Sequence, residues 1–442
     1  MERVSQVLDH INDYVWGIPT LILLVGTGIL LTVRLKGLQF SKLFHALRLA
    51  FGRSEDQSTT GDISHFQALM TSMAATIGMG NIAGVATAIT IGGPGAVFWM
   101  WVTALFGMAT KYSEAILAVK YRIIGSNGEY SGGPMYYLEK GLKQKWLANL
   151  FAIFGATASF GIGNLVQSNS VAEAMRINFS VSPLISGIVM AIFIAIVILG
   201  GVKAIGKVTG YFVPIKAFVY IIAGLIIIIY HLDQVPKAFS LIFSGAFNGT
   251  AAAGGFVGAT IASAIQMGVA RGVFANEAGL GSAPIAAAAA KTDIPAKQAL
   301  VSMTGTFLDT FIVCTITSLV LITTGAWESG KTGVEATTLA FQSVFGQAGS
   351  MVLGIAIILF AYSTILGWSY YGEKCIEYLF GRQAIRYYRY IFIMMIAVGA
   401  NLKLGIVWTF SDIANGLMAI PNLIGLVGLS SVVVMETKQL IK

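Results

Sequence analysis

The stretch Ala74-Ala75-Thr76-Ile77-Gly78-Met79-Gly80-Asn81-Ile82-Ala83-Gly84 decides the fold, because it places three glycines and a polar pair inside an apolar run from about residue 66 to 91. Such a run is expected at bilayer depth, where no water can pair with backbone groups. A glycine-weakened turn there leaves amides and carbonyls that must line an enclosed cavity or hold a ligand. The stretch therefore predicts a broken helix with a binding site at the break, as in a transporter.

Two other interpretations fit the same residues. Gly80 and Gly84 form a small-xxx-small pair, which would let an unbroken helix pack closely against a neighbour. This packing alternative stays open. Gly78, Gly80 and Ala83 also match the loose dinucleotide-binding pattern, in which glycines let a pyrophosphate approach a helix N-terminus. No expected strand precedes them and no acid follows for about thirty residues, so the sequence disfavours a nucleotide site.

The composition indicates a polytopic membrane protein. Of 442 residues, 56% are hydrophobic and only 11% are charged, and the mean hydropathy of +0.78 is too high for a soluble domain of this length. A membrane-spanning helix needs about 20 apolar residues. Eleven such runs cover residues 15–34, 64–91, 95–122, 148–175, 181–201, 209–230, 252–285, 297–324, 346–376, 387–402 and 412–435. We therefore expect an all-α fold with about 11 transmembrane helices.

The positive charges are distributed unevenly between the loops on the two sides of the expected membrane. Twenty lysines and arginines fall on one side and five on the other, so the crowded side is predicted to be cytoplasmic. This places the N-terminus outside the cell, the C-terminus in the cytoplasm and the chain in the plasma membrane. The net charge of +8 is thus explained by topology, and a nucleic-acid partner is not expected.

Several other features narrow the function. The N-terminus lacks the basic flank and cleavage site of a signal peptide, so the first helix is expected to be retained. Cys314 and Cys375 lie in or beside apolar runs and imply no disulfide framework. The four histidines lie in loops or at the ends of spans, so no metal cluster or hydrolytic site can be assembled within a span. A channel would need rings of like residues, and none is visible in the sequence.

A second glycine-interrupted stretch runs from Ala262 to Ser282. By the topology above, its helix enters the membrane in the opposite direction to the first broken helix, and five helices separate the starts of the two. This arrangement predicts inverted repeats with the binding site between them. Arg271 and Glu277 in this stretch are candidate gate or coupling residues, with a structural ion pair as the alternative. Asp309, in the next span, is either a coupling group or a hydrogen-bonded structural acid.

Other polar residues inside spans are candidates for the site or for packing. Gln167 lies deep enough to reach the midplane, and interhelical hydrogen bonding is its alternative role. Ser363 and Thr364 offer hydroxyl oxygens to a cation, and their alternative is to cap their own helix backbone. Trp368 shares a helical face with Thr364. Lys111 and Glu114 are one turn apart, and we expect them to pair with each other rather than to relay protons.

Four segments resemble the alanine/glycine:cation symporter family, and the similarity extends over essentially the whole chain. They are Gly92-Gly93-Pro94-Gly95-Ala96-Val97-Phe98-Trp99 with its continuation to Gly107, Gly163-Asn164-Leu165-Val166-Gln167-Ser168-Asn169-Ser170, Asn276-Glu277-Ala278-Gly279-Leu280-Gly281-Ser282-Ala283-Pro284 and Gly367-Trp368-Ser369-Tyr370-Tyr371-Gly372-Glu373. The resemblance implies the fold of the bacterial leucine transporter, with two inverted five-helix repeats and discontinuous first and sixth core helices. The stretch from Thr76 to Asn81 also resembles that transporter's own Gly-x-Gly-Asn break.

The resemblance also implies a division of the chain. Residues 1–61 would hold an extracellular N-terminus, one extra transmembrane helix and a cytoplasmic interfacial helix, residues 62–231 the first repeat, and residues 232–442 the second, all in one transport domain. The substrate would be met by Thr76, Gly78, Gly80, Asn81, Gln167, Gln266, Gly268 and Trp368. Sodium would be held by the carbonyls of Ala74 and Ile77 and by the hydroxyls of Ser363 and Thr364.

The expected function is the import of alanine or glycine with sodium by alternating access. Proton coupling through Asp309 or Glu277 is the alternative. Besides the coupling ion, no cofactor, enzymatic activity or obligate protein partner is expected. The partners are a small amino acid, sodium and the lipid bilayer.

Overall fold

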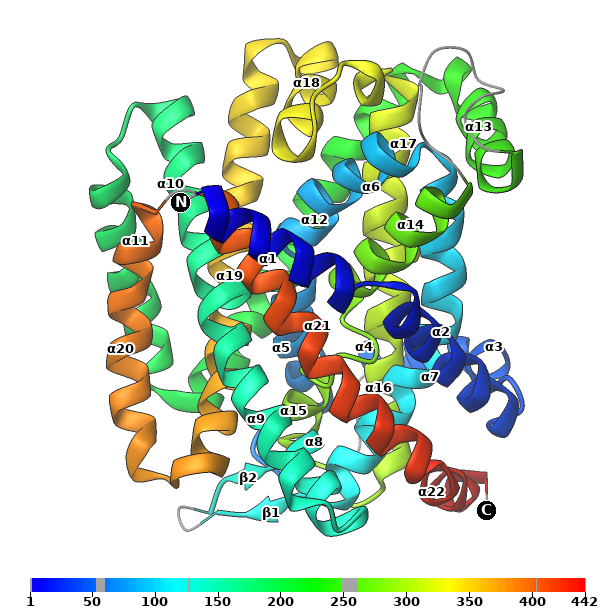
Figure 1. Cartoon of the computed structure of the whole chain (residues 1–442), viewed down its shortest axis with the longest axis vertical. Coiled ribbons are helices and arrows are strands. Elements are labelled where there is room, and N and C mark those ends of the chain that lie inside the picture. The colour runs from blue at the N-terminus through cyan, green and yellow to red at the C-terminus, as the bar shows by residue number, and fades with distance from the viewer. Residues whose placement is uncertain (1, 53–59, 126–127, 249–260, 403, 442) are drawn as a thin grey trace.

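The computed structural model describes residues 2–52, 60–125, 128–248, 261–402 and 404–441, and these residues are almost entirely helical (Figure 1). The strands in these ranges are β1 (Ile123–Ile124) and β2 (Tyr130–Ser131), which pair antiparallel as a short hairpin. We call the end of the molecule with this hairpin the hairpin end. The opposite end carries α18 (Gly333–Phe345) and is called the α18 end.

In the described residues of the first half of the chain, eleven α-helices precede the long α12. They are α1 (Glu2–Val15), α2 (Ile18–Arg34), α3 (Leu38–Ser41), α4 (Leu43–Phe51), α5 (His65–Thr76), α6 (Val85–Gly92), α7 (Gly95–Lys120), α8 (Pro134–Tyr136), α9 (Lys145–Phe160) and α10 (Val166–Phe179), followed by α11 (Pro183–Ile198) and α12 (Gly201–Tyr230). Short π-helical turns connect some of them: η1 (Gly80–Gly84), η2 (Tyr137–Gly141) and η3 (Gly161–Leu165).

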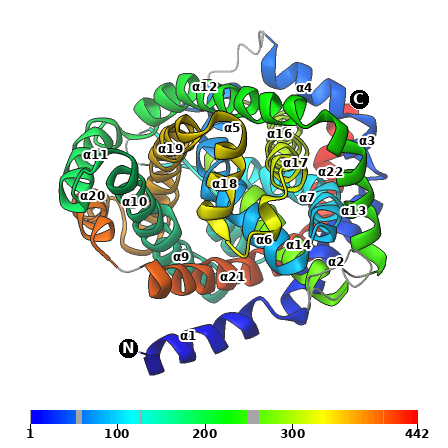
Figure 2. The same cartoon turned by 90° about the horizontal axis from the view of Figure 1, so that it is seen from above.

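The second half is built in the same way. Its helices are α13 (Val235–Asn248), α14 (Ile261–Asn276), α15 (Ala283–Ala288), α16 (Pro295–Thr306), α17 (Thr315–Thr323), α18, α19 (Gln347–Phe380), α20 (Gln383–Ala400), α21 (Leu404–Gly428) and α22 (Ser430–Ile441). The π-helical segment η6 (Phe307–Cys314) joins α16 to α17, and the 3-10 turns η4 (Leu232–Gln234) and η7 (Ala326–Glu328) lie in loops. Viewed from the α18 end, α5 and α6 lie near the centre and α7, α9, α12, α16, α19 and α21 surround them (Figure 2).

The expected apolar runs correspond to helices. Each of the eleven runs contains helical residues, although the run at 252–285 is described only from residue 261. By length and hydropathy, six helical segments of the described chain can cross a membrane, or seven if the bent pair α5 and α6 is one span. The all-α class is therefore confirmed, while eleven spans remain a prediction.

The first predicted break is present. Helix α5 begins at a capping box in which Ser64 and Gln67 each bond to the other's backbone, and it ends at Thr76. Its continuation through η1 and α6 is bent by 52° relative to α5. The bend coincides with Gly78, where the sequence places the weakest helix former. The unbroken helix of the packing alternative is therefore wrong.

The second break lies after α14 rather than inside it. Residues 261–276 form an uninterrupted helix, and the chain leaves helical geometry between Glu277 and Ser282 before α15 begins. Glu277, Gly279 and Gly281 have φ values of +56°, +92° and +82°, a region that glycine enters without steric strain. The second interrupted helix is thus found in the predicted stretch, with its break near the C-terminal end.

Two helices at the α18 end do not correspond to expected spans. Helices α13 and α18 lie over the ends of the core helices (Figure 1), and α18 reaches the first broken helix, where Thr337 Oγ1 donates to the carbonyl of Ile82 at 3.4 Å. Both are too short to cross a membrane. For this reason a search of the sequence for apolar runs of spanning length misses them.

Candidate functional site

At the first break, the backbone amide of Gly78 is linked by hydrogen bonds through Asn81 to the buried acid Asp309. The amide of Gly78 donates to Oδ1 of Asn81 at 2.9 Å, and Nδ2 of Asn81 donates to Asp309 Oδ1 at 2.7 Å. Asn81 and Asp309 are fully buried. The next two amides, of Met79 and Gly80, open the second half-helix and so have no preceding helical carbonyl as a partner. A helix start of this kind favours a bound anion.

The carbonyl side of the break meets α19. Thr364 Oγ1 donates to the carbonyl of Ala74 at 3.1 Å, and Ser363 Oγ approaches the same oxygen at 3.4 Å. The structure thus brings together the four residues expected to hold sodium: Ala74, Ile77, Ser363 and Thr364. A residue that was not predicted from the sequence, Lys216 of α12, contacts the same group. Its Nζ donates to the carbonyl of Ile77 at 2.5 Å and to Ser363 Oγ.

The second break is held by two charged residues of α7. Glu114 Oε1 accepts hydrogen bonds from the amides of Gly279 and Gly281, each at 3.1 Å. Lys111 Nζ donates to the carbonyl of Asn276, the last residue of α14, at 2.8 Å. The expected direct pairing of Lys111 with Glu114 is therefore wrong. The two side chains instead replace backbone partners that the broken helix has lost, which a buried backbone requires.

Glu277 and Trp368 meet beside the second break. Ser282 Oγ donates to Glu277 Oε2 at 2.6 Å, and the Trp368 side chain lies close to the same carboxylate. Trp368 is buried and its Cβ lies directly against Gly163 of η3, where any side chain would collide with it. Thus α19 links the second broken helix to η3 through one indole.

The two broken helices touch at Gly80. A Cβ there would lie 3.1 Å from Cα of Ala275 and 3.2 Å from Phe274 Cδ1, both in α14. At Gly84 the nearest atom would be 4.0 Å away. Of the two glycines, only Gly80 must therefore be small for the two broken helices to approach each other closely. Thr76, the last residue of α5, is buried.

Gln167 has a free hydrogen-bond acceptor. Its Nε2 donates to the carbonyl of Ile162 at 3.0 Å, in the π-helical turn that precedes α10. Its Oε1 is buried and has no hydrogen-bond partner within the described residues. A buried acceptor without a partner is costly, so this oxygen is suited to a donor that the protein itself does not supply.

A cavity of about 930 Å³ opens between the first broken helix and α10, α19 and α21. Met79 and Gly84 of the broken helix line it, opposite Ser170 of α10. Arg271 and Asp412 also line it, with Arg271 Nη1 and Asp412 Oδ2 3.3 Å apart. The sequence reasoning named Arg271 as a candidate gate residue but did not find Asp412, its partner on α21.

Gln266 and Gly268 do not join the residues at either break. Both lie in the uninterrupted part of α14. Gln266 lines a small cavity of about 50 Å³ with Trp16 and Arg271, and Gly268 packs against Ala96 and Trp99 of α7. The resemblance implies that both lie in the pocket, whereas the break lies about nine residues further along a helix that rises roughly 1.5 Å per residue.

At the hairpin end, a β-bridge between Ile63 and Ala290 and the side chain of Arg122 join two segments, and we call this arrangement the Arg122 clasp. Ile63 and Ala290 form a β-bridge that joins the segment before α5 to the segment after α15. The Arg122 guanidinium donates to four carbonyls of these segments, those of Thr60, Ala288, Ala290 and Thr292, at 2.6–3.1 Å. Both broken helices are therefore fixed to each other at this end.

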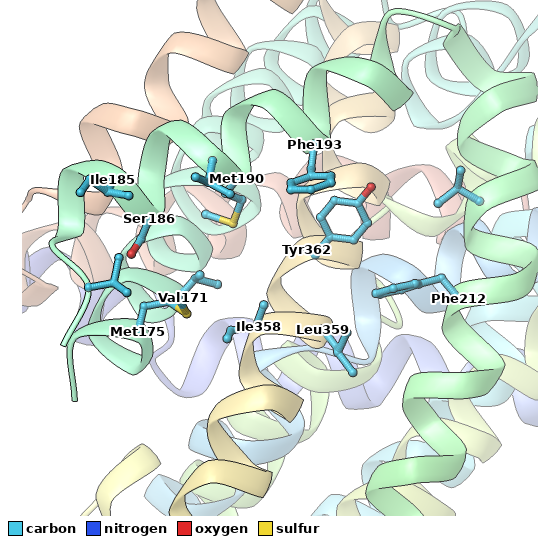
Figure 3. A pocket seen from close by; sticks show the side chains of 13 residues that line it. Val171, Met175, Ile185, Ser186, Met190, Phe193, Phe212, Ile358, Leu359 and Tyr362 are labelled. Atoms are coloured by element: carbon cyan, nitrogen blue, oxygen red, sulfur yellow. The ribbon is translucent and has the colours of Figure 1, made fainter. Parts of the chain in front are cut away.

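A second sizeable cavity is of a different kind. It has a volume of about 450 Å³ and lies between α10, α11, α12 and α19 (Figure 3). Ser186 and Tyr362 carry the only hydroxyl groups among its thirteen lining residues, and the others are aliphatic, aromatic or methionine. A zwitterion would lose its hydration there without gaining charged partners, so we assign no substrate to this cavity.

Comparison with known proteins gives consistent results. A family model described as the sodium:alanine symporter family matches residues 1–442. The sodium/alanine symporter AgcS of Methanococcus maripaludis is 58% identical over 446 residues, covering 99% of this chain and 97% of that protein. A Bacillus subtilis protein named "Probable sodium/glutamine symporter GlnT" is 40% identical, with coverage of 97% and 90%.

The solved structures support the fold. The crystal structure of MhsT in complex with L-phenylalanine superimposes with a TM-score of 0.60 at 13% identity, covering 86% of this chain and 99% of that one. Identity this low shows the fold alone. Its architecture is that of the bacterial leucine transporter, in agreement with the expectation from the sequence.

Proposed function

Because this chain belongs to the sodium:alanine symporter family, a family of transporters and not of enzymes, we propose that it imports a small neutral amino acid, alanine or glycine, together with sodium. We place it in the plasma membrane, with the N-terminus outside and the C-terminus in the cytoplasm. The uneven distribution of positive charge between loops supports this orientation. The hairpin end is then cytoplasmic and the α18 end extracellular.

The observation that carries the proposal is the first break, which has two poles of opposite character. The amides of Met79 and Gly80 start a half-helix, whose positive end suits the carboxylate of an amino acid. The carbonyls of Ala74 and Ile77 end the preceding half-helix, and with the hydroxyls of Ser363 and Thr364 they suit a hard cation. An amino acid and sodium would thus bind on the two sides of one break.

The remaining substrate contacts follow from the same placement. Thr76, Gly78, Gly80 and Asn81 would surround the carboxylate, although Asn81 already bonds to Gly78 and Asp309. The free Oε1 of Gln167 would accept a hydrogen bond from the substrate ammonium. Trp368 would limit the size of the side chain. Because one relative is named for alanine and another for glutamine, this limit must be measured.

We propose alternating access between the two ends of the molecule. The cavity beside Met79 reaches the first break from the α18 end, and the Arg122 clasp closes the hairpin end. Substrate would enter past the Arg271–Asp412 pair, which would act as the outer gate. Opening toward the cytoplasm would then require the clasp to separate.

The two breaks also support the proposed inverted repeats, at residues 62–231 and 232–442. In each repeat an early helix is interrupted, α5 near Gly78 in one and α14 near Gly279 and Gly281 in the other. Buried acids lie close to both breaks, Asp309 at the first and Glu277 and Glu114 at the second. These acids are the observation that would favour proton coupling as the second candidate.

Uptake into proteoliposomes tests the proposal. Purified protein would be reconstituted and given labelled alanine, glycine, leucine and glutamine, with an inward gradient of sodium, potassium or protons imposed in turn. Saturable uptake of alanine or glycine driven by sodium alone is the expected result. Equal uptake under a proton gradient without sodium would favour the second candidate, and uptake that does not saturate would contradict symport.

A further inference from the structure

Lys216 is a buried cation at the centre of the transport site. It projects from α12 and is 1% exposed. Its Nζ donates to the carbonyl of Ile77 at 2.5 Å and to Ser363 Oγ, and it lies 5.0 Å from the ring centroid of Phe360. Within the described chain, no carboxylate lies within ion-pair distance of it. Its direct partners are oxygen dipoles and an aromatic face, and the carboxyl of Asp309 attracts it from beyond ion-pair distance.

These partners overlap with those proposed for sodium. Ile77 and Ala74 present the last carbonyls of α5, at the negative end of a half-helix, and Ser363 and Thr364 add hydroxyl oxygens. We call Ala74, Ile77, Ser363 and Thr364 the cation seat. An ammonium and a sodium ion both need several oxygen partners in a dry site. The Ile77 carbonyl and the Ser363 hydroxyl cannot serve both at close range without strong repulsion between the two charges.

We propose that the Lys216 ammonium and the coupling sodium exclude each other at the cation seat, so that the seat holds one positive charge at every stage of transport. This inference rests on the proposed sodium-coupled function. When sodium enters, the lysine withdraws on its flexible four-carbon stem. When sodium leaves into the cytoplasm, the ammonium returns to Ile77 and Ser363, as seen in the structure.

The exclusion has a consequence for the empty carrier. After release of sodium and substrate, the seat would otherwise present unpaired carbonyls in a dry environment, which is unfavourable. The tethered ammonium satisfies them without carrying an ion back across the membrane. Lys216 should therefore assist the return of the empty carrier, whereas exchange of loaded carriers does not use that step.

The experiment compares Lys216→Met with Lys207→Met. Lys207 is exposed on the same helix and serves as the matched control. If the ammonium occupies the seat nine-tenths of the time, its removal lowers the half-saturation for sodium about tenfold. Lys216→Met should bind sodium correspondingly more tightly, lose most net alanine uptake and retain alanine–alanine exchange with sodium on both sides. Lys207→Met should match the parent in all three measurements.

A second variant, Lys216→Arg, keeps the proposal testable if Lys216→Met does not fold. Lys216→Arg keeps the charge with a larger head group, so it should shift the half-saturation for sodium upward, opposite to Lys216→Met. Thermal melting in detergent with and without sodium reports folding, and sodium should stabilise Lys216→Met more than the parent. If Lys216→Met does not fold, an unchanged or lowered half-saturation in Lys216→Arg overturns the proposal.

The outcomes also separate this proposal from the proposed function. Sodium-driven uptake by the parent together with parental sodium affinity in a folded Lys216→Met variant would refute the exclusion and leave symport intact. Equal loss of net uptake and exchange would make Lys216 a structural tether, which also refutes it. Absence of sodium-driven uptake in the parent would instead refute the proposed function itself.

Discussion

Thr364 lies so close to Gly78 that a Cβ on the glycine would stand 2.5 Å from the threonine Oγ1. The break in the first core helix is therefore packed directly against the hydroxyl of α19 that we assign to the cation seat. This contact joins the substrate side of the break to its cation side with no room for a methyl group between them. A glycine is required here for steric reasons, independent of its backbone freedom.

Gly78→Ala should consequently impair both ligands. We expect the overpacked contact to cost roughly 1–3 kcal/mol and to weaken alanine and sodium binding together. The matched control is Gly84→Ala on the same broken helix, where the nearest atom would be 4.0 Å away. Isothermal titration of both variants with alanine and with sodium measures the effect. Parental affinities in Gly78→Ala would contradict the assigned contact.

Thr364→Ala should weaken sodium dependence more than stability. The variant replaces a hydroxyl oxygen by a methyl group, which cannot coordinate a hard cation. Thr364→Ser keeps the oxygen and is the matched control. Sodium titration of alanine uptake should show a raised half-saturation in the alanine variant only. An equal rise in both variants would indicate a packing effect of the lost methyl group and would remove Thr364 from the seat.

The sequence was sufficient for the helical architecture because apolar runs of spanning length have few alternatives. It also located the first break, where Gly78 and Gly80 lie within a continuous apolar run. The second break lies further along the chain than the resemblance implies, since Gln266 and Gly268, expected at the substrate, lie in the uninterrupted part of α14. Arg271 in the same helix pairs with Asp412, so a polar residue in a span need not mark a break.

The parts of the site that the sequence did not yield depend on pairings between distant segments. The pairing of Asp412 with Arg271 depends on α21 lying beside α14. The role of Arg122 depends on the segments next to both broken helices meeting at its side chain. Lys216 did carry a signal, because it is a lone lysine within an apolar run. An ionisable residue in such a position is by default a functional candidate, but its partners, Ile77 and Ser363, are apparent only in the fold.

Asp62 at the hairpin end should make the stability of the folded protein depend on pH. Its Oδ2 accepts a hydrogen bond from the amide of Tyr130 at 2.7 Å, and burial raises the pKa of its carboxyl above the ordinary value of 3.8. Between the ordinary and the raised pKa, the folded state binds more protons than the unfolded state, so stability falls as pH rises through this window.

Asp62→Asn removes this titration and retains an acceptor for the amide. The variant should melt at a higher temperature than the parent at neutral pH, and the difference should vanish as the pH falls below the ordinary pKa. Thermal melting in detergent across this range is the measurement. A constant difference at all pH values would mean that the titrating carboxyl is not Asp62.

Arg122 should control the opening of the hairpin end. Arg122→Gln cannot span the four carbonyls of Thr60, Ala288, Ala290 and Thr292, so the segments joined by the Ile63–Ala290 bridge should separate more often. Hydrogen–deuterium exchange should then become faster in residues 60–65 and 288–292. Arg386→Gln, at an exposed arginine, is the control and should exchange as the parent does. Parental protection in Arg122→Gln would show that the bridge closes this end without the arginine.

Trp368 is expected to set the size limit of the substrate. Its Cβ is fixed against Gly163 and its ring packs edge-on against Tyr371 at 5.5 Å between centroids, so the ring cannot move aside without breaking these contacts. A larger substrate would have to displace a ring that buries on the order of 200 Å². Such steric exclusion can exceed the roughly 1–3 kcal/mol that one methylene usually supplies in an apolar pocket.

Two substitutions separate volume from hydrogen bonding at this position. Trp368→Ala should admit leucine or methionine and weaken alanine, because the pocket gains volume and the alanine methyl group loses its contact. Trp368→Phe retains most of the volume but not the indole N–H near Glu277, so it should keep the size limit and change stability instead. Competition of labelled alanine uptake by leucine, at matched expression, distinguishes the two effects. If leucine does not compete in a folded Trp368→Ala variant, the ring is only part of the bundle core, and the limit on substrate size must come from Gln167 and the backbone of the first break.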